Sequence, residues 1–138
     1  MDIKMSEMLK KMLDASEDQR IEIARKRTQE MIQLPKEQLA EQIEGTMRAF
    51  NSLNDEDMKV LVRASVIAVD ELPPETKSTI YSARAKAGLT VPEEINYRVL
   101  AAGASATRTN SEENYQFFKR EYKKACNEYS IPFPEFLN

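Results

Sequence analysis

The sequence predicts an all-α protein built from six or seven short antiparallel helices. Apolar residues recur at steps of three and four, which is the pattern of one helix face, and the alternation typical of strands is nearly absent. Residues that favour helix starts also recur at regular intervals. A chain of 138 residues, 41% apolar and 31% charged, is typical of one soluble globular domain, and we expect residues 1–138 to form it.

The predicted helices follow one another with short links. They cover residues 3–14, 17–32, 36–51, 55–70, 74–87, 93–107 and 112–128. Ser16 and Gln19 have the spacing of a capping box, and Asn54 is the predicted N-cap of the fourth helix. Acidic residues stand at the start of every helix from the second onward, where they complement the helix dipole.

Proline and glycine mark further helix boundaries. Pro35, Pro73, Pro74 and Pro92 suit the first turn of a helix, where the missing N–H has no cost. Gly88 follows the last predicted residue of the fifth helix and is the expected C′ residue, a position that is usually left-handed.

A period of 19 residues organises these helices. The segments that begin at this interval are 15–18, 34–37, 53–56, 72–75, 91–94 and 110–113. Two arrangements fit the period: single-helix repeats that pair into 38-residue hairpins and stack as a short solenoid, or a compact bundle whose helices merely share a length. In both, residues 15–128 are the helical units, preceded by an N-terminal helix and followed by a proline- and phenylalanine-rich tail over residues 129–138.

Small residues recur on one face of successive helices, where we expect helix axes to approach closely. The alanines predicted to be buried there are Ala64, Ala68, Ala83 and Ala87. Gly45 holds the equivalent position one unit earlier. Gly103 lies inside a predicted helix, where glycine costs about 1 kcal/mol relative to alanine. Close helix contact is the expected reason, and the floor of a ligand pocket is the alternative.

The N-terminal helix, residues 1–14, carries a methionine stripe that begins at Met1. The candidate partner-binding residues are Met5, Met8, Leu9 and Met12. Methionine is an adaptable side chain, so the stripe suits a groove on a partner or the interface of a dimer. The alternative, which we favour, is that this helix packs on its own domain.

The C-terminal helix mixes aromatic and basic residues. The candidate nucleic-acid contacts are Arg108, Lys119, Arg120, Lys123 and Lys124. The favoured alternative is that the aromatic residues Tyr115, Phe118, Tyr122 and Tyr129 face the core and leave the cations on the solvated side. The same helix carries Cys126, for which we expect a buried and inert thiol. The tail over 131–137 either packs across the helices, as we favour, or serves as a peptide ligand.

Composition excludes several kinds of chemistry. The chain has no His, no Trp, one Cys and three Gly, which excludes histidine-based catalysis, the usual zinc sites, an internal disulfide and glycine-rich phosphate loops. We therefore predict no catalytic residue, no metal and no cofactor. A net charge of −3 disfavours a general nucleic-acid or membrane-surface binder. We expect a cytoplasmic protein, because no secretory signal and no apolar run of about 20 residues occurs.

These observations predict a non-catalytic helical module that binds another protein or a second copy of itself, as an adaptor, assembly subunit or regulator. Two alternatives stay open, because an all-α fold does not define a function. One is a nucleic-acid-associated protein that uses the basic C-terminal helix. The other is a small-ligand carrier or an enzyme that works without histidine.

Overall fold

The computed structural model describes residues 3–138 and confirms the all-α fold: this range contains seven α-helices and no strand. They are α1 (Ile3–Asp14), α2 (Glu17–Met31), α3 (Lys36–Asn51), α4 (Asp55–Asp70), α5 (Pro74–Gly88), α6 (Glu93–Asn110) and α7 (Glu112–Glu128), and a short 3-10 helix, η1 (Glu135–Leu137), lies near the C-terminus. From α2 to α7, one helix begins every 19 residues. The period seen in the sequence is therefore a period of helix starts.

The predicted side-chain caps are present. The Ser16 hydroxyl accepts a hydrogen bond from the backbone N–H of Gln19 at 3.3 Å, and the Gln19 side chain accepts one from the N–H of Ser16, so α2 begins with a capping box. Asn54 Oδ1 accepts from the backbone N–H of Asp57 at 2.8 Å. Ser111 caps α7 in the same way. These contacts explain why the helix starts are set locally.

Two predictions about boundary residues need correction. Of the four prolines, only Pro74 lies inside a first turn, and the other three are N-cap residues one position earlier. Gly88 is not left-handed but is the last residue of α5, and no glycine among residues 3–138 has a positive φ. A Cβ at Gly88 would lie 2.7 Å from Asn96 Oδ1, so glycine is needed there for a close approach by α6. Among the described residues, the one with a positive φ is Ser130, just after α7.

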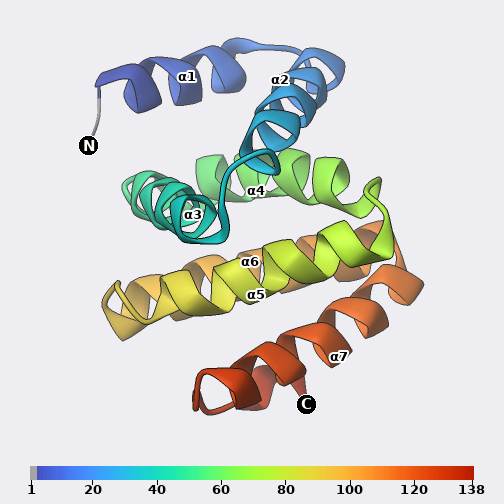
Figure 1. The fold of residues 1–138 in the computed structure, drawn as a ribbon. Helices are drawn as coiled ribbons and strands as arrows, with labels where there is room; N and C mark the ends of the chain where they lie inside the picture. The colour runs from blue at the N-terminus through green and yellow to red at the C-terminus, as the bar shows by residue number, and fades with distance from the viewer. Residues whose placement is uncertain (1–2) are drawn as a thin grey trace.

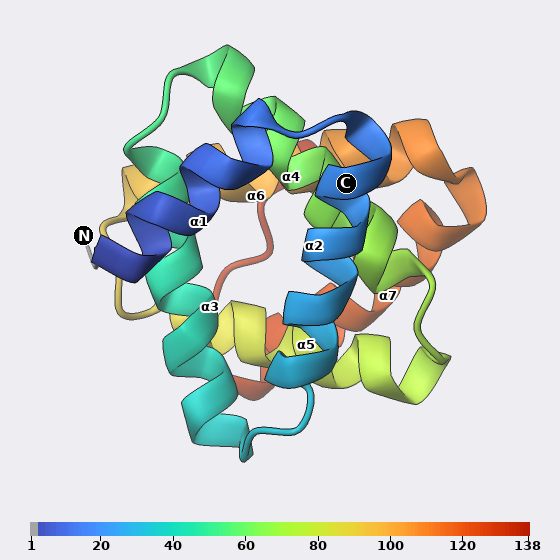
Figure 2. The ribbon, with the colours of Figure 1, turned by 90° about the horizontal axis from the view of Figure 1, so that it is seen from above.

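The helices stack in two layers (Figure 1). From α2 onward, each helix makes its most extensive contacts with a helix two positions away along the chain, so α2, α4 and α6 form one layer and α3, α5 and α7 the other. Successive helices run in opposite directions, as α2, α3 and α4 do in Figure 2. These contacts join alternate helices into a compact two-layer packing, and α1 covers one end of the stack.

Apolar side chains fill much of the space between the layers in two clusters. The larger cluster joins α1 to α6 and contains the fully buried Leu39 and Leu61. The second joins α5, α6, α7 and η1 and contains Tyr122 and Leu137, each 1% exposed. Leu137 shows that the tail packs across the helices, as favoured from the sequence.

The small residues behave as predicted at four of the five positions. Ala64, Ala68, Ala83 and Ala87 are each at most 3% exposed. Gly45 is exposed, however, and a Cβ built on it would meet no atom within 4 Å. The expected close helix contact is therefore wrong at Gly45.

Arg98 of α6 holds the link between α3 and α4. Its guanidinium donates to the carbonyl oxygens of Asn51 and Leu53, at 2.8 and 2.9 Å, and to the carboxylate of Asp55 at 2.8 Å. The last carbonyls of a helix have no partner within the helix, so Arg98 supplies donors that α3 lacks. Its hydrogen bond also holds the pKa of Asp55 below the ordinary value.

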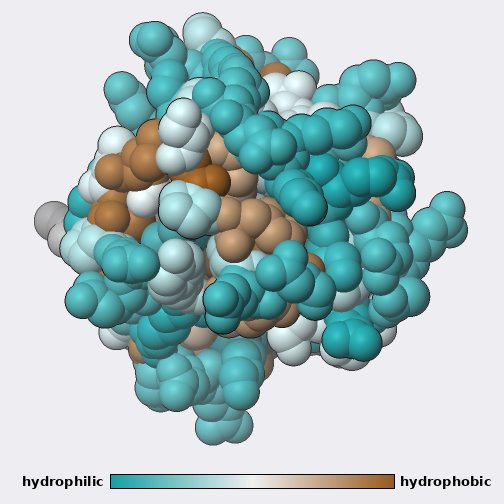
Figure 3. All heavy atoms as spheres, turned by 90° about the horizontal axis from the view of Figure 1, so that it is seen from below, coloured by the Kyte–Doolittle hydropathy of each residue, from teal (hydrophilic) through white to brown (hydrophobic). Residues whose placement is uncertain are grey.

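Much of the face shown in Figure 3 is hydrophilic. In the face shown in Figure 3, apolar side chains gather in one area that hydrophilic residues surround. The large apolar side chains exposed in the described part of the chain are Leu89, Tyr97 and Phe136, and the rings of Tyr97 and Phe136 meet edge to face with centroids 6.2 Å apart. None of the helices within residues 3–138 is both long enough and apolar enough to cross a membrane.

Candidate functional site

The methionine stripe of α1 packs on the chain's own core. Leu9 and Met12 are 2% and 3% exposed, and Met5 and Met8 are half-buried against the same cluster. Met1 lies outside the described residues. The helix therefore docks on its own domain, the alternative favoured from the sequence.

The five candidate nucleic-acid contacts are all on α6 or α7, and each has a partner within the chain. Arg108 and Lys119 lie over the ring of Tyr115 at 5.4 and 5.2 Å, Arg120 over Phe117 at 5.6 Å and Lys123 over Phe133 at 5.7 Å, and Lys124 pairs with Glu121 at 2.9 Å.

The aromatic stripe of α7 faces inward, as the favoured alternative predicted. Tyr115, Phe118 and Tyr122 are buried, and Tyr129 is half-buried. Their rings are therefore packed against the protein and not presented for stacking on bases. Cys126 is fully buried on the same side, and burial raises the pKa of its thiol, which agrees with the predicted inert cysteine.

The feature with the most distinctive chemistry is a cavity between the two layers, which we call the central cavity. Its volume is about 200 Å³, and residues from α1 to α7 line it. Most of its surface is apolar. Apolar residues of its wall include Met12, Ile43, Phe50, Val62, Val66 and Val99.

One position of the 19-residue period supplies a polar row to the central cavity. Ten residues after the starts of α2, α3, α4, α5 and α6, this position holds Arg27, Thr46, Ser65, Arg84 and Gly103. All five residues line the cavity. The stacking of equal helices therefore brings residues that are distant in sequence to one site.

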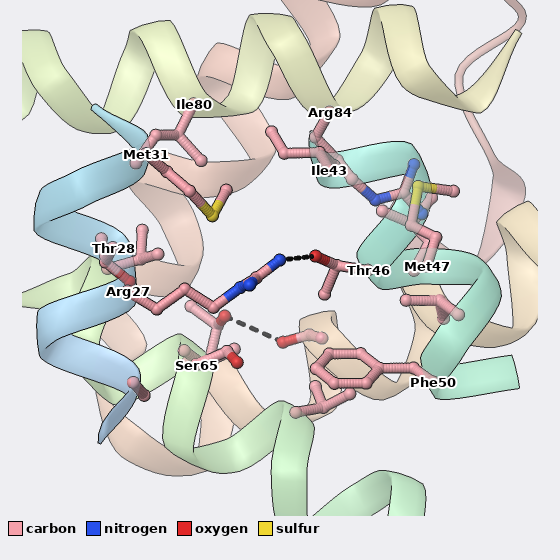
Figure 4. A pocket seen from close by; sticks show the side chains of 18 of the residues that line it. Arg27, Thr28, Met31, Ile43, Thr46, Met47, Phe50, Ser65, Ile80 and Arg84 are labelled. Carbon is pink, nitrogen blue, oxygen red and sulfur yellow. Dashed lines mark hydrogen bonds between the residues drawn. The ribbon is translucent and has the colours of Figure 1, made fainter. Parts of the chain in front are cut away.

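Arg27 is a polar side chain that crosses the central cavity. Figure 4 shows it extending from α2 across the cavity to α3, between Met31 and Ser65. Its Nη2 donates to Thr46 Oγ1 at 2.7 Å, and its Nη1 contacts the sulfur of Met8 at 3.6 Å. Burial lowers the pKa of the guanidinium below its ordinary value, although Glu30 partly opposes this effect.

Arg84 enters the cavity from α5 and is held by α6. Its two terminal nitrogens donate to Asn96, one to Oδ1 at 2.6 Å and one to the carbonyl oxygen at 3.0 Å. Burial lowers the pKa of this guanidinium also. The same Asn96 side chain lies against Gly88, which leaves room for it.

Gly103 contributes space to the cavity. It is half-buried in α6, and a Cβ built on it would meet no atom within 4 Å. The expectation that close helix contact explains this glycine is therefore wrong. The alternative, a position on the wall of a pocket, describes where Gly103 lies.

A partly buried polar cluster adjoins the cavity where α4 ends. The carboxylate of Asp70 lines the cavity and accepts from Asn110 Nδ2 at 2.8 Å. Burial raises its pKa, and the hydrogen bond from Asn110 partly opposes this rise. Lys77, 7% exposed, donates to Asn114 Oδ1 at 2.9 Å and lies 4.8 Å from the ring centre of Phe117.

Most of this site was not predicted from the sequence. Gly103 stood out as a glycine inside a helix, whereas Arg27, Thr46, Ser65 and Arg84 did not stand out. The available signal was the 19-residue period, because aligning the units by their helix starts places these residues in one column with Gly103.

The arrangement favours binding of a small molecule. The apolar walls suit the apolar groups of a ligand, and the guanidinium and hydroxyl groups can hydrogen-bond to an anionic or polar end of it. Within residues 3–138, no group of three or more His, Cys, Asp or Glu side chains is placed to hold a metal ion. Comparisons of the chain with protein-family models, with curated proteins and with solved structures found no match.

Proposed function

We propose that this protein binds a small, largely apolar ligand in the central cavity, which is the carrier function left open by the sequence. The observation that carries the proposal is the cavity itself: about 200 Å³, with a mostly apolar wall. An apolar cavity of about 150 Å³ is large enough to bind benzene. The space therefore suits a ligand of about six to eight carbon atoms.

The glycine on the cavity wall supports this function. Gly103 lies inside α6, where glycine costs about 1 kcal/mol relative to alanine. A Cβ built on Gly103 would meet no atom within 4 Å, so the missing side chain leaves space on the wall of the cavity. A ligand that fills this space would make the contacts that a side chain here does not make.

The other two functions inferred from the sequence stay predictions with less support. The interaction module was inferred from the absence of catalytic residue types, the possible repeats and the methionine stripe, and Leu9 and Met12 of that stripe are buried in their own domain. The nucleic-acid function was inferred from basic residues among aromatic ones, and these cations contact side chains of their own helix or its neighbours.

The chain offers internal probes for a direct test. Met8, Met12, Met31 and Met47 line the central cavity, whereas Met58 does not. We expect benzene and 1-hexanol, titrated into protein with ¹³C-labelled methionine methyls, to shift the NMR signals of the four lining methionines and leave Met58 unchanged. Unchanged signals at saturating ligand would refute the proposal.

A pair of variants adds a control for location. Gly103→Leu places a side chain in the open space of the cavity and is expected to abolish the shifts. Gly45→Leu makes the same change on the exposed side of α3, where a Cβ also meets nothing within 4 Å, and is expected to leave them intact. Equal ligand shifts in both variants would mean that the ligand binds elsewhere.

A further inference from the structure

The polar groups around Arg27 have unused hydrogen-bonding capacity. A guanidinium has five N–H donors, and in Arg27 one donates to Thr46 and one contacts the sulfur of Met8. Ser65 lines the same cavity from α4, and its hydroxyl makes no hydrogen bond to any residue between 3 and 138. No buried side-chain nitrogen or oxygen among residues 3–138 lacks a hydrogen-bond partner, so the unpaired Nε–H of Arg27 and the Ser65 hydroxyl are accessible to solvent and to a ligand.

The positive charge of Arg27 also has no close ion-pair partner within residues 3–138, and Glu30 attracts it only from a longer distance. No carboxylate within the described range of the chain lies within 4.0 Å of Arg27 or Arg84. Arginines on the outer surface differ: Arg25 pairs with Glu71 at 2.8 Å, and Arg63 pairs with Glu17 at 3.2 Å. Arg27 is half-buried, and its charge is partly removed from water without a close ion-pair partner, so an anion that enters the site offsets part of this desolvation cost.

Arg84 has a different role at this site. Its two terminal nitrogens are both hydrogen-bonded to Asn96. Its charge is therefore held in place on α5, in the opposite layer from Arg27. Asp70 is the acidic residue on the cavity wall, and it is bonded to Asn110 where α4 ends. Two arginines and one aspartate leave the wall with a net positive charge when all three are ionised.

We infer that the ligand of the central cavity is an amphipathic carboxylate, with its carboxylate on the free N–H groups of Arg27 beside Ser65 and its apolar body among the side chains of the wall. This inference rests on the proposed function and names the ligand class. A guanidinium matches the two oxygens of a carboxylate with parallel N–H donors, so two of the unused donors suffice. The volume suits an apolar body of about six to eight carbon atoms.

The test compares ligands with equal chains and different ends. Octanoate and 1-octanol are titrated into the intact protein by isothermal titration calorimetry, with wild-type and Arg27→Met chains. We expect Arg27→Met to weaken octanoate at least 10-fold and to change the affinity for 1-octanol less than 2-fold. Hexanoate should bind wild-type protein more weakly than octanoate by about 4-fold for each methylene removed, since a buried methylene contributes about 0.8 kcal/mol.

Matched variants exclude indirect effects. Arg63→Met removes an exposed, ion-paired arginine and should leave both affinities unchanged. Ser65→Ala should weaken octanoate about 3-fold or more through loss of one hydrogen bond and spare 1-octanol. Circular dichroism checks that each variant is folded. If Arg27→Met does not fold, Ser65→Ala together with Arg27→Lys, which keeps the charge and loses the paired donors, carries the test.

The outcomes separate this inference from the proposed function. If 1-octanol binds and Arg27→Met weakens both ligands equally or neither, the ligand has no carboxylate site at Arg27 and the inference is wrong, although the apolar cavity site stands. If neither ligand binds the wild-type protein or shifts its lining methionines, both the inference and the proposed function are wrong. Selective loss of octanoate supports both.

Discussion

Replacing Gly103 with alanine tests the central cavity without any ligand. Gly103 lies inside α6, has no positive φ, and faces space in which a Cβ meets no atom within 4 Å. Alanine is therefore tolerated by the backbone and by the surroundings. Glycine-to-alanine changes at such positions stabilise a protein by reducing the freedom of the unfolded chain.

Two contributions set the expected size of the effect. The change in helix propensity contributes about 1 kcal/mol. Placing a methyl group on the partly buried wall of the cavity adds up to about 0.8 kcal/mol. We expect Gly103→Ala to raise the free energy of unfolding by about 1–2 kcal/mol.

The two other glycines of the chain serve as controls. Gly45→Ala has the same propensity gain in α3 but places its methyl group in solvent, so we expect a gain of at most about 1 kcal/mol. Gly88→Ala would bring its Cβ to 2.7 Å from Asn96 Oδ1, which must move away from Arg84. We expect this variant to lose about 1–2 kcal/mol, mainly from the broken hydrogen bond.

Urea unfolding followed by circular dichroism measures all three variants. With a urea dependence of about 2 kcal/mol per molar, typical of a small domain, Gly103→Ala should raise the midpoint by about 0.5–1 M. The order of stability should be Gly103→Ala, then Gly45→Ala, then wild type, then Gly88→Ala. A Gly103→Ala protein less stable than wild type would show that α6 packs tightly at this residue and would refute the cavity there.

Four further predictions concern the rest of the fold. Arg98→Ala should cost about 2 kcal/mol of stability in urea, because two bonds to backbone carbonyls are lost, whereas the exposed Arg63→Ala should cost under about 0.5 kcal/mol. Deleting residues 1–14 should lower the thermal midpoint and cost about 2–4 kcal/mol, and an unchanged midpoint would contradict docking of α1 on its own domain. Ala68→Leu should destabilise by about 1–3 kcal/mol through overpacking, and an unchanged denaturant midpoint would contradict its close contact. Cys126 should react with a thiol reagent slowly in the folded protein and rapidly in urea, and fast labelling of the folded protein would disprove its burial.

Local signals made the helices predictable. Ser16, Asn54 and the acidic first turns act within a few residues of themselves, so the sequence contains all the information that sets these helix starts. The inward face of α7 was predictable for a related reason: Tyr115, Phe118 and Tyr122 recur at helical spacing, and large aromatic side chains are stable when buried.

The environment of single residues was not predictable, because it depends on contacts between distant helices. Gly45, Gly88 and Gly103 all lie in helices and look alike in the sequence, yet one faces solvent, one faces a neighbouring amide and one faces a cavity. Arg27 and Arg84 are three periods apart, and each has the sequence context of an ordinary surface arginine. A periodic pattern gives the angle of a residue around its helix, but the stacking of the two layers decides what lies opposite.

The alternation of layers makes this architecture sensitive to whether its number of units is odd or even. Insertion of a single 19-residue unit between α2 and α5 would transfer every later helix to the opposite side of the molecule. Arg27 and Arg84 now lie in opposite layers, and after this insertion they would lie in the same layer. Insertion of two units would lengthen the stack and keep both side assignments. Viable length variants of this chain should therefore differ by pairs of helices, and engineered insertions of 38 residues should be tolerated where insertions of 19 are not.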